Sequence, residues 1–206
     1  MMALVPKSKG KHRVSQAEAS QRLIDATIKL AGDTLMSEMT VGKIANEAGL
    51  GSGNVLIKRY FGFRKDLLLA AASKLADQII AMLQEPRENV SDNPVINAIA
   101  IGTQTHILIR KRFVIISELV DVISDDSILR MDSLRIMQAM ATNYLKTGIG
   151  ERMAFTFAMK TYGLLYAQHT VLPLVEVTKE QLDDLFLLIL FEFGSALELE
   201  KMVGWA

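Results

Sequence analysis

The chain of 206 residues is half apolar in composition and has no formal net charge, with 23 basic and 23 acidic side chains. That length and apolar content suffice for one ordinary domain, or for a small domain joined to a larger one. Cysteine is absent, which excludes disulfides and thiolate metal sites, and the longest strongly apolar run, 185–191, is too short to span a membrane. With no apolar export signal after the basic N-terminus, we expect a cytoplasmic protein.

Charge is distributed unevenly along the chain. Residues 1–66 hold 11 Lys or Arg against 6 Asp or Glu, whereas residues 67–206 hold 12 against 17. A basic segment is typical of a surface that meets polyanions such as nucleic acid; chance variation in solvated charge is the alternative. Residues 1–14 carry four Lys or Arg and no acid, with almost no apolar pattern, so we expect a flexible basic arm.

Three short helices are predicted after the arm. A capping box, Ser-Gln-Ala-Glu, opens the first helix, and Thr40 suits the N-cap of the second. Gly49 can adopt a positive φ between the second and third helices, where the chain must turn sharply. The predicted ranges are 15–33, 40–47 and a third helix that begins at Ser52 or Asn54 and ends at about 61. The order of helix, tight turn and helix predicts a helix-turn-helix domain over residues 15–62.

The remaining residues continue the helical pattern, with Gly62, Gly148, Gly150, Pro86, Pro94 and Pro173 at the predicted helix ends or first turns. An amphipathic helix over 63–85 bridges the basic head and the acidic body. The other predicted helices are 94–110, 113–122, 127–146, 151–172 and 178–202. Strand-like alternation is absent from the sequence, so we predict an all-α protein of about nine helices, with residues 63–206 forming a second helical domain.

The second helix of a helix-turn-helix fits the major groove of DNA and presents its N-terminal residues to base edges. Small residues let the backbone approach the duplex, polar side chains bind bases or phosphates, and Lys and Arg neutralise phosphates. These requirements select as candidate DNA-binding residues Thr40, Val41, Lys43, Gly51, Ser52, Gly53, Asn54, Lys58, Arg59, Tyr60, Arg64 and Lys65.

At about residues 18–70 the sequence resembles the DNA-binding domain of the TetR (tetracycline repressor) family of bacterial regulators. The matches to that family's pattern, some of them conservative, are Thr40, Val41, Ile44, Ala45, Ala48, Gly49, Leu50, Gly51, Ser52, Gly53, Asn54, Tyr60, Phe61, Leu67 and Leu68. The resemblance implies a DNA-binding transcriptional regulator, most often a repressor, whose remaining helices bind a ligand and form a homodimer.

The sequence departs from the family pattern in the third helix. Five residues, Val-Leu-Ile-Lys-Arg, separate Asn54 from Tyr60, where the family usually has three, and two residues rotate a helix by about 200°. Either Val55 and Leu56 occupy the family's isoleucine and tyrosine positions and the helix bulges near its end, or Ile57 and Lys58 occupy them. The family's phosphate-contacting aromatic residue is absent in both alignments, so Lys58 or Arg59 would replace it. A further departure, Phe-Arg-Lys, makes the start of the fourth helix unusually basic.

The last predicted helix is apolar on two sides at its centre, so it must contact protein twice. Together with the preceding helix it predicts an isologous dimer through a four-helix bundle; a helix central to its own domain is the alternative. The predicted dimer contacts are Ala158, Leu165, His169, Leu187, Leu188 and Phe191. Candidates for lining an apolar effector pocket, to which core packing is the alternative, are Leu75, Ile79, Met82, Thr103, His106, Ile107, Phe113, Ile116, Met137, Met140, Tyr162 and Tyr166.

Two other classes of protein, an enzyme and a protein-interaction module, fit the sequence less well. An enzyme is disfavoured because Gly-Leu-Gly-Ser-Gly at 49–53 follows no strand and lacks the rest of a phosphate-binding motif, and the three histidines are isolated. The sequence contains no cofactor motif or metal-ligand cluster. An all-helical protein-interaction module without DNA binding is the alternative, but it accounts for neither the basic arm nor the glycine turn. We therefore expect a regulator that a small, mostly apolar effector releases from a palindromic operator.

Overall fold

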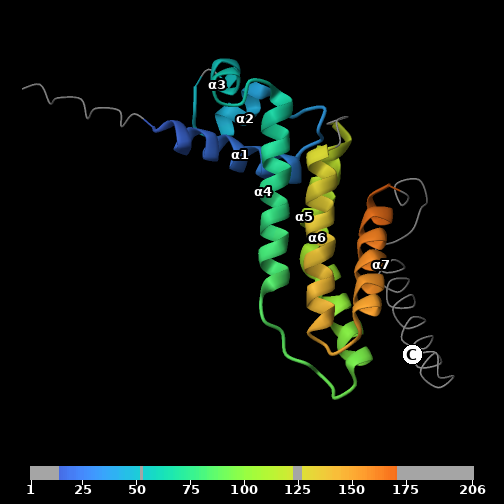
Figure 1. The fold of residues 1–206 in the computed structure, drawn as a ribbon. Helices are drawn as coiled ribbons and strands as arrows, with labels where there is room; N and C mark the ends of the chain where they lie inside the picture. Colours follow the sequence, from blue (N-terminus) through green and yellow to red (C-terminus); the bar gives the residue numbers. More distant parts are fainter. Residues whose placement is uncertain (1–13, 52, 123–126, 171–206) are drawn as a thin grey trace, which may run out of the picture.

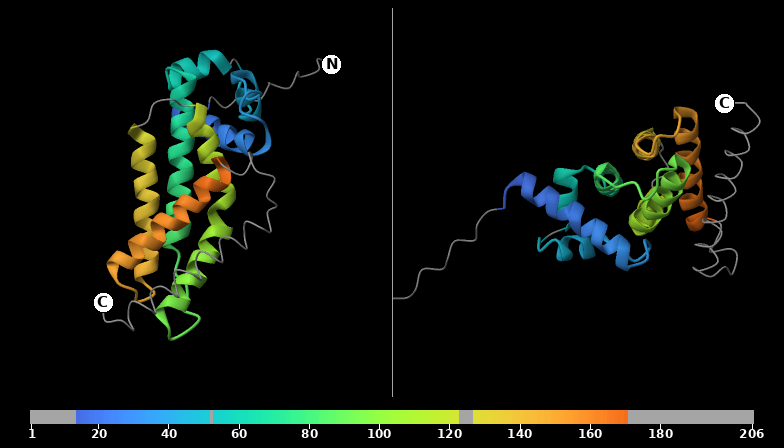
Figure 2. Two further views of the ribbon diagram at one scale, coloured as in Figure 1. Left: turned by 90° about the vertical axis from the view of Figure 1, so that its right-hand side faces the viewer. Right: turned by 90° about the horizontal axis from the view of Figure 1, so that it is seen from below.

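The computed structural model describes residues 14–51, 53–122 and 127–170, and these residues form seven α-helices and no strand (Figure 1). The first three helices lie at one end of a bundle formed by the other four (Figure 2). None of the described helices combines the length and apolar character needed to cross a membrane. The bounds are α1 Gln16–Asp33, α2 Val41–Glu47, α3 Gly53–Tyr60, α4 Arg64–Gln84, α5 Pro94–Val122, α6 Ser127–Leu145 and α7 Glu151–Thr170.

Local sequence signals account for the ends of the first helices. The Ser15 hydroxyl accepts a hydrogen bond from the Glu18 amide at 3.2 Å, and Thr40 Oγ1 accepts one from the Lys43 amide at the same distance. Each bond satisfies a backbone donor that a helix N-terminus leaves unpaired. Gly49 has φ +66° after α2, as the sequence predicts, because only glycine adopts this conformation without strain.

The predicted division of residues 94–122 into two helices is wrong. α5 is continuous from Pro94 to Val122, so the eight helices predicted within the described residues are seven. Ile109 and Phe113 are both buried one turn apart, and no glycine or proline separates them. The apolar stripe therefore continues through the basic run at 110–112, within which the predicted helices were separated. The helix predicted at 178–202 lies outside the described residues.

The long helix α4 contributes to two hydrophobic cores. Its N-terminal half, including Leu68 and Ala72, packs in a core with α1, α2, α3 and the C-terminal part of α5. Its C-terminal half, including Ile79 and Leu83, packs in a second core with α5, α6 and α7. Ile116 of α5 packs against both cores. α4 and α5 thus connect the three-helix end to the bundle, so neither half moves without repacking apolar contacts.

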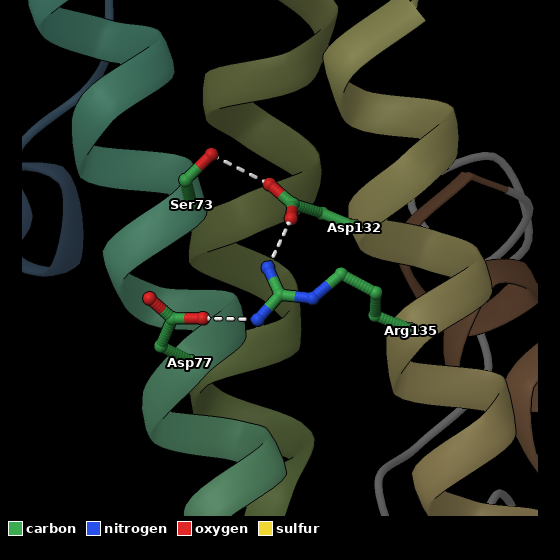
Figure 3. Close-up of polar contacts among 4 residues, drawn as sticks. All are labelled: Ser73, Asp77, Asp132 and Arg135. Atoms are coloured by element: carbon green, nitrogen blue, oxygen red, sulfur yellow. Dashed lines mark hydrogen bonds and ion pairs between the residues drawn. The ribbon is translucent and has the colours of Figure 1, made fainter.

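A polar network joins α4 to α6 above the second core (Figure 3). Asp132 is 7 % exposed and accepts hydrogen bonds from the Ser73 hydroxyl at 2.6 Å and from Arg135 Nη1 at 2.8 Å. Arg135 Nη2 also donates to Asp77 on α4, so the guanidinium lies between two carboxylates. These interactions raise the pKa of Arg135, with the Asp77 hydrogen bond as the largest cause. Asp132 is the buried member, and each of its carboxylate oxygens accepts from one of the two donors.

The close approach of α2 and α3 requires glycine at position 53. A Cβ atom placed on Gly53 would lie 2.7 Å from the Val41 carbonyl oxygen and 2.8 Å from the Ala45 Cβ atom. Gly51, two residues earlier, has open space where a Cβ atom would point, and its φ is not positive. The two glycines therefore differ: Gly53 permits two helices to touch, whereas the protein's own packing places no such demand on Gly51.

Replacing Asp132 with Ala should lower the free energy of unfolding by about 1 to 3 kcal/mol, because Ser73 and Arg135 lose their shared buried acceptor. The matched control is Asp77→Ala, which removes a carboxylate that is 62 % exposed. An exposed ion pair contributes less than about 1 kcal/mol, so the control should be the milder change. Urea denaturation followed by circular dichroism measures both. If both variants lost the same free energy of unfolding, the burial of Asp132 would not be the cause of its contribution to stability.

Replacing Gly53 with Ala should destabilise the protein by about 1 to 3 kcal/mol, because the added methyl group collides with backbone that cannot rotate away. Gly51→Ala is the matched control, with an expected change within about 0.5 kcal/mol. Chemical denaturation of both variants tests the difference. If G53A were as stable as G51A, α2 and α3 would have room for a methyl group at position 53, and their contact would not require glycine.

Candidate nucleic-acid interface

The outer face of α3 is polar and basic, and its inner face anchors it to the protein. Asn54, Val55, Lys58 and Arg59 are exposed, at spacings that place them on one side of the helix. Ile57 is 3 % exposed and belongs to the core shared with α1, α2 and α4. α3 therefore presents two cations and an amide from a short helix whose position is set by a buried side chain and the Gly53 contact.

The burial pattern bears on the two alignments left open by the sequence. α3 is continuous from Gly53 to Tyr60, without a bulge near its end. Val55 is 65 % exposed, whereas Ile57 is buried in the core. Ile57 is therefore the residue of α3 that faces the core, and the neighbouring Lys58 is exposed. Which of the two alignments holds stays a prediction.

Arg64 is directed into the protein. Its Nη2 atom donates to the Met39 carbonyl oxygen at 3.0 Å and lies 3.5 Å from the Met36 carbonyl oxygen. These carbonyls belong to the segment between α1 and α2. Its guanidinium thus holds this segment against the start of α4, and its predicted role in neutralising phosphate stays a prediction.

The other candidate DNA-binding residues surround α3. Thr40 caps α2, Val41 is half-buried against the first core, and the exposed Lys43 lies 3.8 Å from Glu38. Tyr60 is also half-buried, with the Arg59 guanidinium 5.7 Å from its ring centroid. This cation–π contact favours a fixed position for Arg59 at the end of the recognition face. Gly51 is exposed, Lys65 is half-buried, and Ser52 lies outside the described residues.

The predicted effector residues are gathered mainly in the second core, as packed side chains. The Phe113 and Tyr162 rings meet edge to face with centroids 5.0 Å apart, and the Tyr162 hydroxyl donates to Ser133 Oγ at 2.7 Å. Ile107 is 67 % exposed and Tyr166 also lies on the surface, so both are directed away from this group. The buried members are Leu75, Ile79, His106, Phe113 and Met140, and the half-buried members are Met82, Thr103, Ile116, Met137 and Tyr162.

Two clefts lie instead at the junction of the three-helix end and the bundle. One, of about 380 Å³, is bordered by α1, α4 and α5, and the other, of about 630 Å³, by residues 31–37 and Glu118. Leu75 is the one predicted effector residue that lines either of them. Lys111 and Arg112 of the first cleft were missed by the sequence reasoning, which placed them between two predicted helices.

The predicted dimer contacts divide by location. Ala158 and Leu165 are buried inside the subunit's second core, so their side chains are not available to another chain. His169 lies in α7, and Leu187, Leu188 and Phe191 lie outside the described residues. The exposed apolar side chains of α7 are Phe155, Met159 and Tyr166. Their spacing of four and seven residues is a signal that the sequence reasoning overlooked.

Titratable side chains in the bundle are structural. Burial raises the pKa of Tyr144 to about 12, and its hydroxyl lies 2.6 Å from the Thr161 hydroxyl. Burial also raises the pKa of Tyr162 and lowers that of Arg87, whose Nη1 atom donates to Thr105 Oγ1 at 2.9 Å. Among the described residues there is no group of three His, Asp or Glu side chains that could hold a metal ion.

No protein-family model matches the sequence, and a search of curated proteins finds no significant match. Solved structures do match. A TetR-family transcriptional regulator from Streptomyces coelicolor aligns with a TM-score of 0.66 and 14 % identity over 91 % of this chain and 83 % of its own. A TetR transcriptional regulator from Rhodococcus sp. RHA1 aligns with a TM-score of 0.55 and 14 % identity over 86 % and 96 %.

A third structure is the multidrug-binding protein EbrR complexed with imidazole, with a TM-score of 0.55 and 17 % identity over 84 % of this chain and 93 % of its own. The alignments cover most of each chain. The chain therefore has the fold of the TetR-family transcriptional regulators.

Proposed function

We propose that this protein is a homodimeric transcriptional regulator, a repressor that a small, mostly apolar effector releases from a palindromic DNA operator. The observation that carries the proposal is the outer face of α3, where Asn54, Lys58 and Arg59 are exposed on a helix held rigidly against α2. A groove-reading helix needs this combination of a fixed inner face and a polar, basic outer face.

The roles of the α3 residues follow from their chemistry. Asn54 carries an amide that donates and accepts, which suits the paired donor and acceptor on the major-groove edge of adenine. Lys58 and Arg59 supply positive charge for phosphates on either side of the groove. Val55, exposed between them, offers an apolar contact for a thymine methyl group. Asn54 and Val55 thus read bases, and Lys58 and Arg59 bind the backbone.

Dimerisation is supported by the apolar side chains on α7. Phe155 is 46 % exposed and Met159 is 53 % exposed, one turn apart, with Tyr166 two turns further on. An exposed apolar stripe on a helix at the edge of a bundle is suited to a contact between identical chains (Figure 1). Two α3 helices joined in this way would read half-sites about 34 to 36 Å apart.

Effector control is supported by the two cores that share α4. Leu75 and Ile79 lie one turn apart on α4, but Leu75 belongs to the core of the three-helix end and Ile79 to the core of the bundle. A ligand that favours a repacked bundle therefore also shifts the three-helix end. The coupling free energy for such effects is about 1 to 3 kcal/mol, and it acts equally in both directions. An effector therefore weakens DNA binding to the extent that DNA weakens effector binding.

DNA recognition is tested on duplexes selected by the protein from a random library, and on DNA upstream of its coding region. Asn54→Ala should reduce discrimination between the selected sequence and its single-base variants by about 1 to 3 kcal/mol. Lys58→Ala should weaken binding to all sequences alike and reduce the slope of log K against log salt by about 1. Gel-shift titrations at several salt concentrations measure both quantities.

Arg152→Ala is the control for Lys58→Ala, because it removes an exposed cation from α7, away from the interface. It should leave the salt slope unchanged. A wild-type protein that selects no DNA sequence even at low salt would refute DNA regulation and favour an all-helical protein-interaction module. If N54A and K58A bound as the wild type does, the recognition face would lie elsewhere.

Dimerisation is tested by Met159→Glu, which places a charge in the middle of the α7 stripe. The wild-type chain should sediment at twice its 22.8 kDa mass, and the variant should sediment as a single chain over a wide range of concentrations. Lys160→Glu is the control, because it changes charge at an exposed position of the same helix that lies about 100° around the helix from Met159 and farther from Phe155 and Tyr166. Analytical ultracentrifugation that finds M159E and K160E equally dimeric would remove α7 from the interface.

A further inference from the structure

The smaller of the two junction clefts has three walls, each formed by one face of a helix. α1 contributes Ile28, Lys29, Gly32 and Asp33; α4 contributes Leu75 and Gln78; α5 contributes Lys111, Arg112 and Ile115. Leu75 and Ile115 are buried and form an apolar floor, whereas Lys111 is exposed and Arg112 is half-buried. The cleft thus combines an apolar base with cationic side chains, in a volume of about 380 Å³.

The charge of the lining is predominantly positive. Lys29 forms an ion pair with Glu47 of α2, and this partner raises the pKa of Lys29. Lys111 and Arg112 form no ion pair with another described residue, so no acidic side chain in the described part of the chain neutralises their charge. Asp33 is the one carboxylate in the lining, and it is exposed. An organic anion is therefore the ligand that this lining favours.

The cleft lies where the two halves of the molecule touch. A Cβ atom placed on Gly32 of α1 would lie 3.2 Å from Ile115 Cδ1 of α5, so the two helices are almost in van der Waals contact there. α1 belongs to the three-helix end, and α5 extends along the bundle (Figure 2). A molecule seated on Leu75 and Ile115 would lie against both helices at this contact, and would shift the angle between them.

We propose that this cleft binds a small amphipathic anion, with an aromatic or acyl body on Leu75 and Ile115 and its acidic group on Lys111 and Arg112. Apart from Leu75, the cleft shares no lining residue with the predicted effector pocket. Its regulatory effect rests on the proposed DNA-binding function: the bound anion changes the placement of α1 to α3 relative to the bundle, and hence DNA affinity. Binding itself does not depend on that function.

Binding is tested on the full-length protein with 1-anilinonaphthalene-8-sulfonate, a fluorescent aromatic anion, and with N-phenyl-1-naphthylamine, which has the same rings without the sulfonate. The double variant Lys111→Gln/Arg112→Gln should bind the sulfonate about tenfold more weakly, because the charge-assisted hydrogen bonds are lost. Binding of the neutral probe should change little. Fluorescence titration yields both affinities.

The control is Arg152→Gln/Lys160→Gln, which removes two cations from the exposed part of α7. It should leave the affinity for the sulfonate unchanged. If both double variants bound the sulfonate with the same affinity, the site would be overturned.

A second measurement needs no variant: the sulfonate should slow acetylation of Lys111 relative to Lys146 in the wild-type protein, as measured by mass spectrometry. Equal rates at both lysines would also overturn the site.

The regulatory effect is tested with a selected DNA duplex at a saturating concentration of the sulfonate. DNA affinity should change by about 5- to 150-fold, and the Lys111→Gln/Arg112→Gln variant should lose this response. An unchanged DNA affinity with the cleft occupied would overturn the regulatory part. If the protein bound no DNA, the proposed function would fail, while the fluorescence and acetylation measurements would still decide whether the anion site exists.

Discussion

The packing of α4 in two hydrophobic cores is the constraint on which the rest of the structure depends. Leu68 and Ala72 belong to the core of the three-helix end, and Ile79 and Leu83 belong to the core of the bundle. Because interiors are close-packed, a helix shared by two cores transmits displacement from one to the other instead of absorbing it. The polar network around Asp132 adds a second connection, between α4 and α6. In this network a buried carboxylate keeps two hydrogen-bond donors.

The proposed recognition face is built on this rigid support by a few short-range contacts. Gly53 brings α3 against the Val41 carbonyl oxygen, Ile57 anchors its inner side, and Arg64 holds the segment before α2. The side chains that project from α3 are then fixed in direction by the helix itself. This arrangement explains why glycines precede a basic helix here: Gly49 permits the turn after α2, Gly53 permits the contact between α2 and α3, and Lys58 and Arg59 of α3 remain exposed.

The largest difference between the sequence prediction and the structure concerns the faces of the long helices. Periodicity identified α7 as helical, but it assigned Ala158 and Leu165 to a surface between subunits, whereas both are buried within one chain. Lys111 and Arg112 were placed between two predicted helices, although α5 continues through them and directs them toward a cleft with α1. Periodicity reports that a helix has an apolar face, but it does not report which neighbour covers that face.

The sequence by itself determined the all-helical class, the starts of α1 and α2, the glycine turn before α3 and the candidate recognition residues. These features depend on interactions within a few residues, such as the Thr40 cap and the positive φ of Gly49. Only the tertiary structure decided that Ile57 is the buried residue of α3, that Arg64 is directed inward and that α5 is one helix. Those outcomes depend on contacts between segments distant in the chain, whose geometry a local pattern does not contain.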